Sequence, residues 1–232
     1  QFVNRGGANK LKMIYNGVSV DIFNPQTPPL DLHARYGILS NQLTIGYVGR
    51  MHPRKNLLLL IEAFGQVLAR IPNAVLLLAA AVDDTICAEY AMRVKQRVKA
   101  LGLESCVVID EGVVPNIPAL YRAMKLTVYP APIDYFPMAI LESLASGVPV
   151  VNASEGGPRE AFVDGESGRQ VPPGNPEAIA AAIVELLTDP HLLQRMGRNA
   201  RAHAVKFFND ADFAEQVESL YREVIEASVT RG

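Results

Sequence analysis

Residues 43–56 read Leu43-Thr-Ile-Gly-Tyr-Val-Gly-Arg-Met-His-Pro-Arg-Lys-Asn56, and this stretch decides the fold. Its apolar and β-branched start, Leu43–Val48, predicts a short buried strand. Gly49 and Pro53 then mark a turn, and an amphipathic helix is expected over about residues 55–71. A strand that leads through a tight turn into a helix is the first half of a parallel βαβ unit.

The same alternation continues along the chain. Further strands are expected at Ala74–Ala81, Cys106–Glu111, Leu126–Ala131, Val148–Ala153 and Arg169–Val171. Helices are expected at Ala88–Leu101, Ile117–Met124, Pro137–Ser146, Pro176–Leu187 and His191–Phe207. Because each parallel pair of strands needs a crossover, this order predicts an α/β domain with a Rossmann-like parallel sheet and helices on both faces.

Two segments flank this domain, which is expected to cover residues 31–208. Residues 1–30 hold a short strand candidate at Lys12–Tyr15 and a Pro-rich loop, and we interpret them as an interdomain linker. Residues 209–232 hold a last helix, about Asp210 to Ala227, with apolar residues at helical spacing. Such a helix needs a surface to cover.

Composition excludes several classes of protein. The chain has 22 basic and 24 acidic residues and a formal net charge of −2, which argues against a nucleic-acid partner. No apolar run approaches the roughly 18 residues that span a bilayer. Cys87 and Cys106 lack a second Cys or His at ligand spacing, so no disulfide framework or zinc site is expected, and a reducing cytoplasm is the expected location. The chain starts at Gln1 without a signal-peptide pattern, which suggests a piece of a longer protein.

The turn after the first strand carries three cations, Arg50, Arg54 and Lys55, at or just before a helix amino terminus. Helix amino termini favour acids, and no acid follows in the first turn to offset these charges. A bound anion would relieve the conflict, and Arg50 and Lys55 could converge on one diphosphate, with Arg54 as a bystander. The alternative is that all three are solvated loop charges.

A second candidate is the pair of acids in Asp134-Tyr-Phe-Pro-Met-Ala-Ile-Leu-Glu142. Pro137 suits a helix start, and Met138, Leu141, Leu144 and Ala145 are expected to form the packing face. Two carboxylates could serve as a glycosidase-type acid and base, as a metal site, or as acceptors for sugar hydroxyls. No third oxygen ligand is evident nearby, so no metal is expected. The plainer alternative is a turn-forming Asp134 and a partly exposed Glu142.

A third segment, Gly156-Gly-Pro-Arg-Glu160, also follows a predicted strand directly. Two glycines allow a ligand to approach the backbone, but an ordinary structural turn explains them equally well. The chain contains no Gly-x-Gly-x-x-Gly and no Walker-type sequence, which disfavours a dinucleotide dehydrogenase or an NTPase.

Taken in order, these segments resemble the C-terminal, donor-binding domain of retaining GT-B-type glycosyltransferases of group 1 (family 4), which include sucrose synthases, glycogen synthases and bacterial mannosyltransferases. The resemblance covers most of the chain. It rests on Tyr15-Asn-Gly-Val-Ser-Val-Asp-Ile-Phe-Asn-Pro25, Val48-Gly-Arg50, Lys55-Asn56, Asp134 to Val151, Gly156–Glu160, Asp164-Gly-Glu-Ser-Gly168 and Val171-Pro-Pro-Gly-Asn-Pro-Glu-Ala178. The order and spacing of these motifs are specific, although no single one is decisive.

The resemblance implies roles for individual residues. Gly49, Arg50 and Lys55 would hold the diphosphate of a UDP-, GDP- or ADP-sugar, Asp134 would lie by the donor sugar, and Glu142 would accept hydrogen bonds from the ribose. Backbone N–H groups around Phe136, Met138 and Ala139 would hold phosphate or sugar oxygens, and the base would lie against Val113 and Val114. Asp134, Arg50 and Lys55 would be the catalytic residues, with no metal and no further cofactor.

The resemblance also implies a missing partner. The acceptor would bind to an N-terminal domain that this chain lacks, and the helix in 209–232 would pack on that domain. Any peripheral membrane contact would be made through it. The chain alone is expected to bind donor without efficient transfer.

Two departures from the family pattern leave the sugar open: Asp134 stands where Glu is common, and Pro130-Ala-Pro132 stands where a Pro-Ser pair is common. The alternatives are a non-catalytic nucleotide-binding module and a GT-B-shaped epimerase or phosphorylase.

Overall fold

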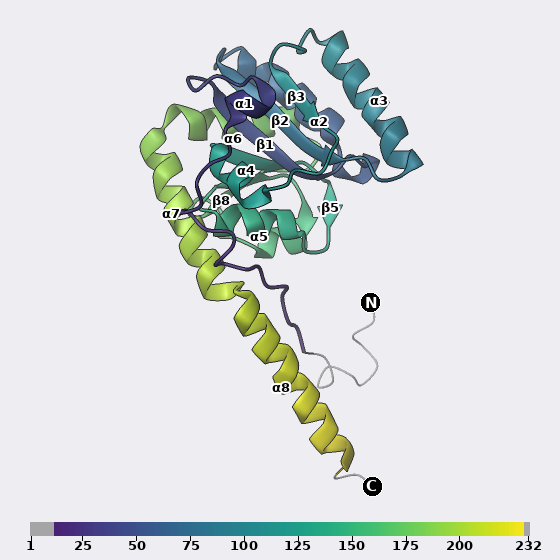
Figure 1. Ribbon diagram of the computed structural model, residues 1–232, viewed down its shortest axis with the longest axis vertical. Helices are drawn as coiled ribbons and strands as arrows, with labels where there is room; N and C mark the ends of the chain where they lie inside the picture. The colour runs from purple at the N-terminus through teal and green to yellow at the C-terminus, as the bar shows by residue number, and fades with distance from the viewer. Residues whose placement is uncertain (1–11, 230–232) are drawn as a thin grey trace.

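The structure is a computed structural model that describes residues 12–229, and a six-stranded parallel sheet lies at its centre (Figure 1). The strand order is β3-β2-β1-β4-β6-β8. The strands are β1 (Leu43–Arg50), β2 (Ala74–Ala81), β3 (Val107–Asp110), β4 (Leu126–Tyr129), β6 (Val150–Asn152) and β8 (Gly168–Gln170). The chain builds outward from β1 to β3 and then returns to add β4 on the other side, so the order reverses between β1 and β4. The Rossmann-like α/β fold is confirmed.

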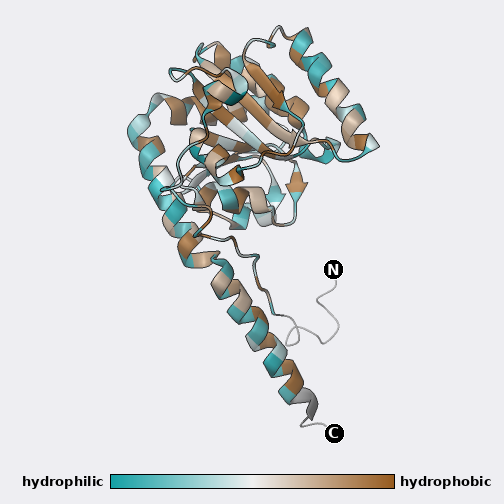
Figure 2. Ribbon diagram, viewed as in Figure 1, coloured by the Kyte–Doolittle hydropathy of each residue, from teal (hydrophilic) through white to brown (hydrophobic). Residues whose placement is uncertain are grey.

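Helices cover both faces of the sheet. Successive apolar side chains along each strand point to opposite faces, so both faces need to be covered. They are α1 (Leu32–Tyr36), α2 (Leu57–Leu68), α3 (Thr85–Ala100), α4 (Ile117–Ala123), α5 (Met138–Ala145), α6 (Pro176–Thr188), α7 (Pro190–Phe207) and α8 (Asp210–Val229). On β2, Leu76 and Leu78 pack with Phe64 of α2, whereas Leu77 packs on the other face with Leu120 of α4. The strands and the inner sides of these helices are accordingly the most hydrophobic parts of the ribbon (Figure 2).

Two helix starts differ from the prediction. Helix α2 begins at Leu57, because Pro53–Lys55 form a 3-10 turn and Asn56 takes a left-handed conformation with φ of 54°. Helix α5 begins at Met138, after an extended Pro137. Met138 is 38% exposed and does not belong to the packing face, which Ile140, Leu141, Leu144 and Ala145 form.

A two-stranded sheet that the sequence did not predict sits apart from the main sheet. Its strands, β5 (Ile133–Asp134) and β7 (Glu155–Gly156), pair in parallel. They follow β4 and β6 respectively, so this small sheet joins the two loops that leave the carboxyl ends of those strands. A Cβ on the next residue, Gly157, would lie 1.3 Å from the Tyr135 carbonyl oxygen, which explains why glycine is present there.

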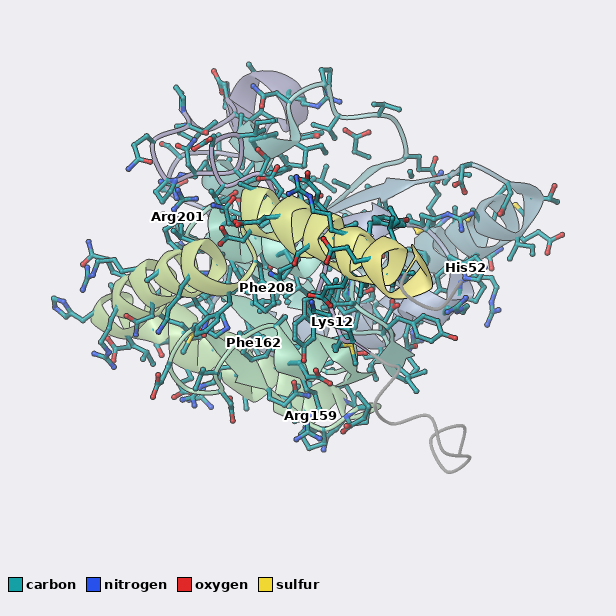
Figure 3. The ribbon with its side chains drawn as sticks, turned by 90° about the horizontal axis from the view of Figure 1, so that it is seen from below. Lys12, His52, Arg159, Phe162, Arg201 and Phe208 are labelled. Carbon is teal, nitrogen blue, oxygen red and sulfur yellow. The ribbon has the colours of Figure 1, made fainter. Side chains whose placement is uncertain are left out.

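The flanking segments differ from the prediction in one respect. Lys12–Tyr15 is not a strand; in the described part of this segment, Val18 forms a β-bridge with Asn209. Helix α8 extends well beyond the domain (Figure 1), and Lys12 lies beside it, with its Nζ 3.0 Å from Glu223 (Figure 3). Apolar side chains along α8, including Tyr221 and Val224, are exposed. The prediction that α8 packs on another domain stays a prediction. No helix within residues 12–229 is long and apolar enough to cross a lipid bilayer.

Candidate functional site

The predicted site residues lie around the carboxyl ends of β1 and β4, where the strand order reverses. Ligands of open parallel sheets bind in the crevice at such a point. Arg50 ends β1, Lys55 follows it in the 3-10 turn, and Asp134 lies in the loop after β4. Glu142 lies on α5, the helix that starts at this edge. The fold therefore brings all four charged residues to one edge of the sheet.

Lys55 and Asp134 form the inner part of the site. The Lys55 ammonium donates to Asp134 Oδ2 at 2.6 Å and to the Tyr129 hydroxyl at 2.7 Å. The Tyr129 hydroxyl in turn donates to the same Asp134 oxygen at 2.5 Å. The side chains of Lys55 and Asp134 are 23% and 15% exposed, so solvent screens this pair only in part. Burial raises the pKa of the Asp134 carboxyl, but the hydrogen bonds from Lys55 and Tyr129 outweigh it, and the pKa lies below its usual value.

Arg50 forms the outer part of the site. Its guanidinium donates to Asp83 Oδ1 at 2.7 and 3.2 Å and to Asp84 Oδ2 at 2.9 Å. These hydrogen bonds lower the pKa of the Asp83 carboxyl. Asp84 also caps α3, because it accepts from the Cys87 N–H at 2.7 Å. The three side chains of this ion-pair group are about half exposed, at 48, 51 and 42%.

The first turn of the helix after the basic turn holds no acid, as expected, but acids from other segments pair with two of the three cations. The acids do not come from the helix that follows the turn. They come from the loop after β2, which supplies Asp83 and Asp84, and from β5, which supplies Asp134. Arg54 is exposed and forms no ion pair within the described residues. Arg50 and Lys55 thus pair with separate carboxylates.

Glu142 occupies a half-buried position beside the core. The hydroxyl of Tyr121, a fully buried residue on α4, donates to Glu142 Oε2 at 2.9 Å. Burial raises the pKa of the Glu142 carboxyl, and the Tyr121 hydrogen bond opposes this rise only in part. Since one carboxylate oxygen has a donor and the other has none within the described residues, Glu142 can accept a further hydrogen bond from a hydroxyl.

The amino terminus of α5 is open to a ligand. No side chain caps it, and its first turn holds no acid. The N–H groups at Met138 and Ala139 therefore lack both an intrahelical partner and a side-chain cap. Phe136, just before the helix, packs its ring against Tyr15 at 5.1 Å and against Phe208 at 5.5 Å between centroids. These contacts fix the loop that carries Asp134.

A cavity of about 490 Å³ opens beside this loop. Asp134, Phe136, Gly156, Gly157 and Arg54 line it, together with Tyr15, whose hydroxyl donates to Glu160. Of the predicted charged residues, only Asp134 faces this cavity; Arg50, Lys55 and Glu142 lie outside its lining. Asp134 therefore lies between the cavity on one side and the Lys55 ammonium on the other.

Two other groups of residues bear on the prediction. Val113 is 87% exposed, whereas Val114 is buried with Ile38 and Leu120 on the opposite face of the sheet. Contact of a base with this loop stays a prediction.

The ligand atoms of Asp83, Asp84 and Cys87 lie within 4.8 Å of one another, which is close enough for a metal ion, but both carboxylates already accept hydrogen bonds from Arg50.

Sequence reasoning missed four residues of this arrangement: Asp83, Asp84, Tyr121 and Tyr129. The two acids directly follow a predicted strand, and the rule that ligand sites lie at the carboxyl ends of strands could have found them. The two tyrosines lie in apolar elements and could not be distinguished from core aromatics without knowledge of their partners.

Comparison with known proteins agrees with this fold. The family model "Glycosyl transferases group 1" matches residues 31–203. The chain is 28% identical over 220 residues to the D-inositol 3-phosphate glycosyltransferase of Corynebacterium glutamicum, covering 94% of this chain and 52% of that protein. It is 29% identical to the lipopolysaccharide core biosynthesis mannosyltransferase LpcC of Rhizobium leguminosarum, covering 92% and 60%.

Solved structures show the same similarity. The sucrose-phosphate synthase of Thermosynechococcus elongatus superimposes with a TM-score of 0.82 at 29% identity, covering 93% of this chain and 53% of that one. Anabaena HepE, in complex with UDP, superimposes with a TM-score of 0.83 at 27% identity, covering 91% and 57%.

The fold is the Rossmann-like half of GT-B glycosyltransferases, with charged side chains gathered at its switch point. The chain belongs to the group 1 glycosyltransferase family. It spans about half the length of the curated relatives that it matches.

Proposed function

We propose that this chain binds a nucleoside diphosphate sugar and presents its sugar for transfer, with retention of configuration, to an acceptor held by another domain. The observation that carries this proposal is the half-buried Lys55–Asp134 pair at the switch point, 2.6 Å apart. It places a cation for a diphosphate and a carboxylate for sugar hydroxyls side by side. Carboxylates repel phosphate but accept hydrogen bonds from hydroxyls, so the two residues serve different parts of one donor.

The proposed roles follow from charge. Lys55, Arg50 and the open amino terminus of α5 stabilise the diphosphate as it leaves and gains negative charge, the part that a divalent metal takes in other transferases. The proposal therefore assigns no metal to this site. Asp134 accepts from the donor sugar, and Glu142, held by Tyr121, accepts from the ribose.

The nature of the donor is supported by relatives. Anabaena HepE, 28% identical to this chain, has been solved with UDP-glucose, and the Rhizobium relative is a mannosyltransferase. We therefore propose a hexosyl donor. The relatives are about twice as long as the matched region, which supports an acceptor-binding domain outside this chain. The exposed apolar side chains of α8 offer a surface for that domain.

A calorimetric titration of the chain tests the proposal. UDP, GDP and ADP, and the glucose and mannose conjugates of the preferred nucleotide, are titrated in turn. We expect one nucleoside diphosphate to bind with a dissociation constant of about 1 µM to 1 mM, the usual range for substrates, and we expect no efficient transfer by the chain alone. Absence of binding by all three nucleotides would refute the donor-binding role. Full transferase activity in this chain would refute the need for a second domain.

A further inference from the structure

A second hollow lies at the opposite end of the sheet, away from the candidate donor site. Lys125 and Pro149 line it, and they directly precede the first residues of β4 and β6, so it opens at the amino ends of these strands. Gly147, after the end of α5, and one side of α7 complete its wall. Its volume is about 860 Å³, within the usual range for small-molecule sites.

The charges on this hollow are of one sign. Arg122, Lys125, Arg198 and Arg201 line it, and no Asp or Glu belongs to its lining. None of these four forms a salt bridge within the described residues, whereas most cations near the donor site are paired with acids. For a protein with a net charge of −2, four cations without a salt bridge on a single hollow are a marked local excess.

Two of these cations are held in place by backbone carbonyls. Arg201 Nη1 donates to the carbonyls of Val20, Phe23 and Ala145 at 2.9, 2.8 and 3.0 Å, which fixes this α7 side chain against the end of α5 and the N-terminal segment. Arg122 Nη1 donates to the Ser146 carbonyl at 3.2 Å. Carbonyl dipoles orient these guanidinium groups without cancelling their charge.

The hydrogen bonds to backbone carbonyls account for part of the role of Arg122 and Arg201. Other N–H donors and the positive charges of these side chains are not explained by them. The Arg122 Nε is buried and has no acceptor within the described residues. Burial lowers the pKa of Arg201, and the charge of Asp21 opposes this only in part. Lys125 and Arg198 are exposed and donate no hydrogen bond to any described residue, so the structure gives them no capping role.

We propose that this hollow binds a phosphate-bearing anion at a site separate from the donor site. Guanidinium groups match phosphate oxygens in planar, two-pronged hydrogen bonds, and Lys125 adds a compact charge. Fixed Arg122 and Arg201 form the floor, and the exposed Lys125 and Arg198 close on the ligand from the rim. A phosphate group can come from a soluble metabolite or from an acidic lipid headgroup, and the two sources share this chemistry.

The test titrates the full 232-residue chain with inorganic pyrophosphate and follows backbone amide shifts by NMR. We expect shifts at Gly147 and Arg198, separate from any at Asn56 in the basic turn. The double variant Lys125→Ala with Arg198→Ala should weaken this binding at least tenfold and leave the affinity for a nucleoside diphosphate unchanged.

The double variant Lys99→Ala with Arg195→Ala is the matched control, because it removes the same charge from exposed positions outside the hollow. Shifts confined to the basic turn, or an equal loss in both double variants, would overturn the proposal. Binding to vesicles of phosphatidylcholine with phosphatidylglycerol separates the sources. A loss of vesicle binding specific to the first double variant indicates a lipid headgroup, and pyrophosphate binding without vesicle binding indicates a soluble ligand.

Discussion

The Lys55 ammonium lies 2.6 Å from the carboxylate of Asp134, a residue 79 positions further along the chain. Two loops from neighbouring strands bring the pair together, and the Tyr129 hydroxyl bonds to both side chains. Lys55 therefore already has a negatively charged partner before any phosphate arrives. Under the proposed function, a diphosphate would bind beside this carboxylate or exchange with it, and several consequences can be measured.

Replacement of Lys55 by Ala should weaken nucleoside diphosphate binding by about 10- to 100-fold, since a charge-assisted hydrogen bond contributes roughly 1.5–3 kcal/mol. Isothermal titration calorimetry measures the effect. Lys95→Ala is the matched control, because Lys95 forms an ion pair with Glu111 on the exposed surface. If Lys55→Ala and Lys95→Ala bind the nucleoside diphosphate with equal affinity, Lys55 is a solvated loop charge and does not contact the diphosphate.

Replacement of Asp134 by Asn should change the affinities for the free nucleoside diphosphate and for the nucleotide sugar differently. The neutral amide no longer repels phosphate, so the free nucleoside diphosphate should bind as tightly as before or more tightly. The sugar hydroxyls lose a charged acceptor, so the nucleotide sugar should bind more weakly. The ratio of the two dissociation constants is the measurement, and a ratio equal to that of the unmodified chain would argue against contact between Asp134 and the sugar.

Replacement of Asp83 by Asn should release Arg50. The pair is about half exposed, so its loss should hardly change the melting temperature. Because Arg50 then has one fewer carboxylate partner, we expect nucleoside diphosphates to bind severalfold more tightly and with a steeper dependence on salt. Asp83 is preferable to Asp84 for this test, since Asp84 also caps α3. Weaker binding by this variant would show that Asp83 positions Arg50 and does not compete for it.

Glu142 predicts a dependence of stability on pH. Burial raises the pKa of its carboxyl in the folded protein above the ordinary value of 4.5. As pH rises through 4.5, the Glu142 carboxyl loses its proton in the unfolded chain before it does so in the folded protein. Ionisation therefore favours the unfolded chain, and the free energy of unfolding falls as pH rises. Glu142→Gln cannot ionise and should gain stability relative to the unmodified protein between pH 4 and pH 7, provided that the bond to Tyr121 is kept.

Thermal unfolding at both pH values measures this difference. Glu89→Gln is the control, because Glu89 is exposed on α3. A difference in melting temperature between Glu142→Gln and the unmodified chain that does not grow from pH 4 to pH 7 would contradict the prediction.

Replacement of two glycines by alanine should change the free energy of unfolding in opposite directions. A Cβ at Gly157 would meet the Tyr135 carbonyl carbon and oxygen, at 2.5 and 1.3 Å, so Gly157→Ala should destabilise the protein by about 1–3 kcal/mol. Gly65 lies inside α2, and apart from its chain neighbours and the adjacent helix backbone no atom lies within 4 Å of the added Cβ, so Gly65→Ala should stabilise the protein by about 0.5–1 kcal/mol. Urea denaturation measures both. A stable Gly157→Ala variant would show that the loop relaxes.

The fold was largely predictable because each buried strand and amphipathic helix has a hydrophobic pattern that can be recognised within about ten to twenty residues. Errors arose where a distant partner decides the structure. Lys12–Tyr15 has the composition of a strand but no neighbour in the sheet. The pairing of β5 with β7 involves only two residues from each strand, too few for a periodic pattern. Helix α2 starts late because Asn56 adopts a left-handed conformation, which composition does not reveal.

The site was predictable to a smaller extent. The positions of Arg50, Lys55 and Asp134 at one edge follow from the order of strands, and the structure bears this out. Their ion pairs do not follow from it, because each acid comes from a different loop. The buried tyrosines that bond to Asp134 and Glu142 depend on packing in three dimensions.

The small sheet of β5 and β7 has a mechanical consequence. Its hydrogen bonds tie the Asp134 loop to the glycine loop, and the latter leads directly to Glu160, which accepts from Tyr15 on the N-terminal segment. The two loops are thus one connected unit, with Asp134 at one end and the N-terminal segment at the other. The position of the Asp134 carboxylate is therefore coupled to that of Tyr15 through backbone pairing and one side-chain hydrogen bond, and not through Asp134 and Tyr15 touching each other.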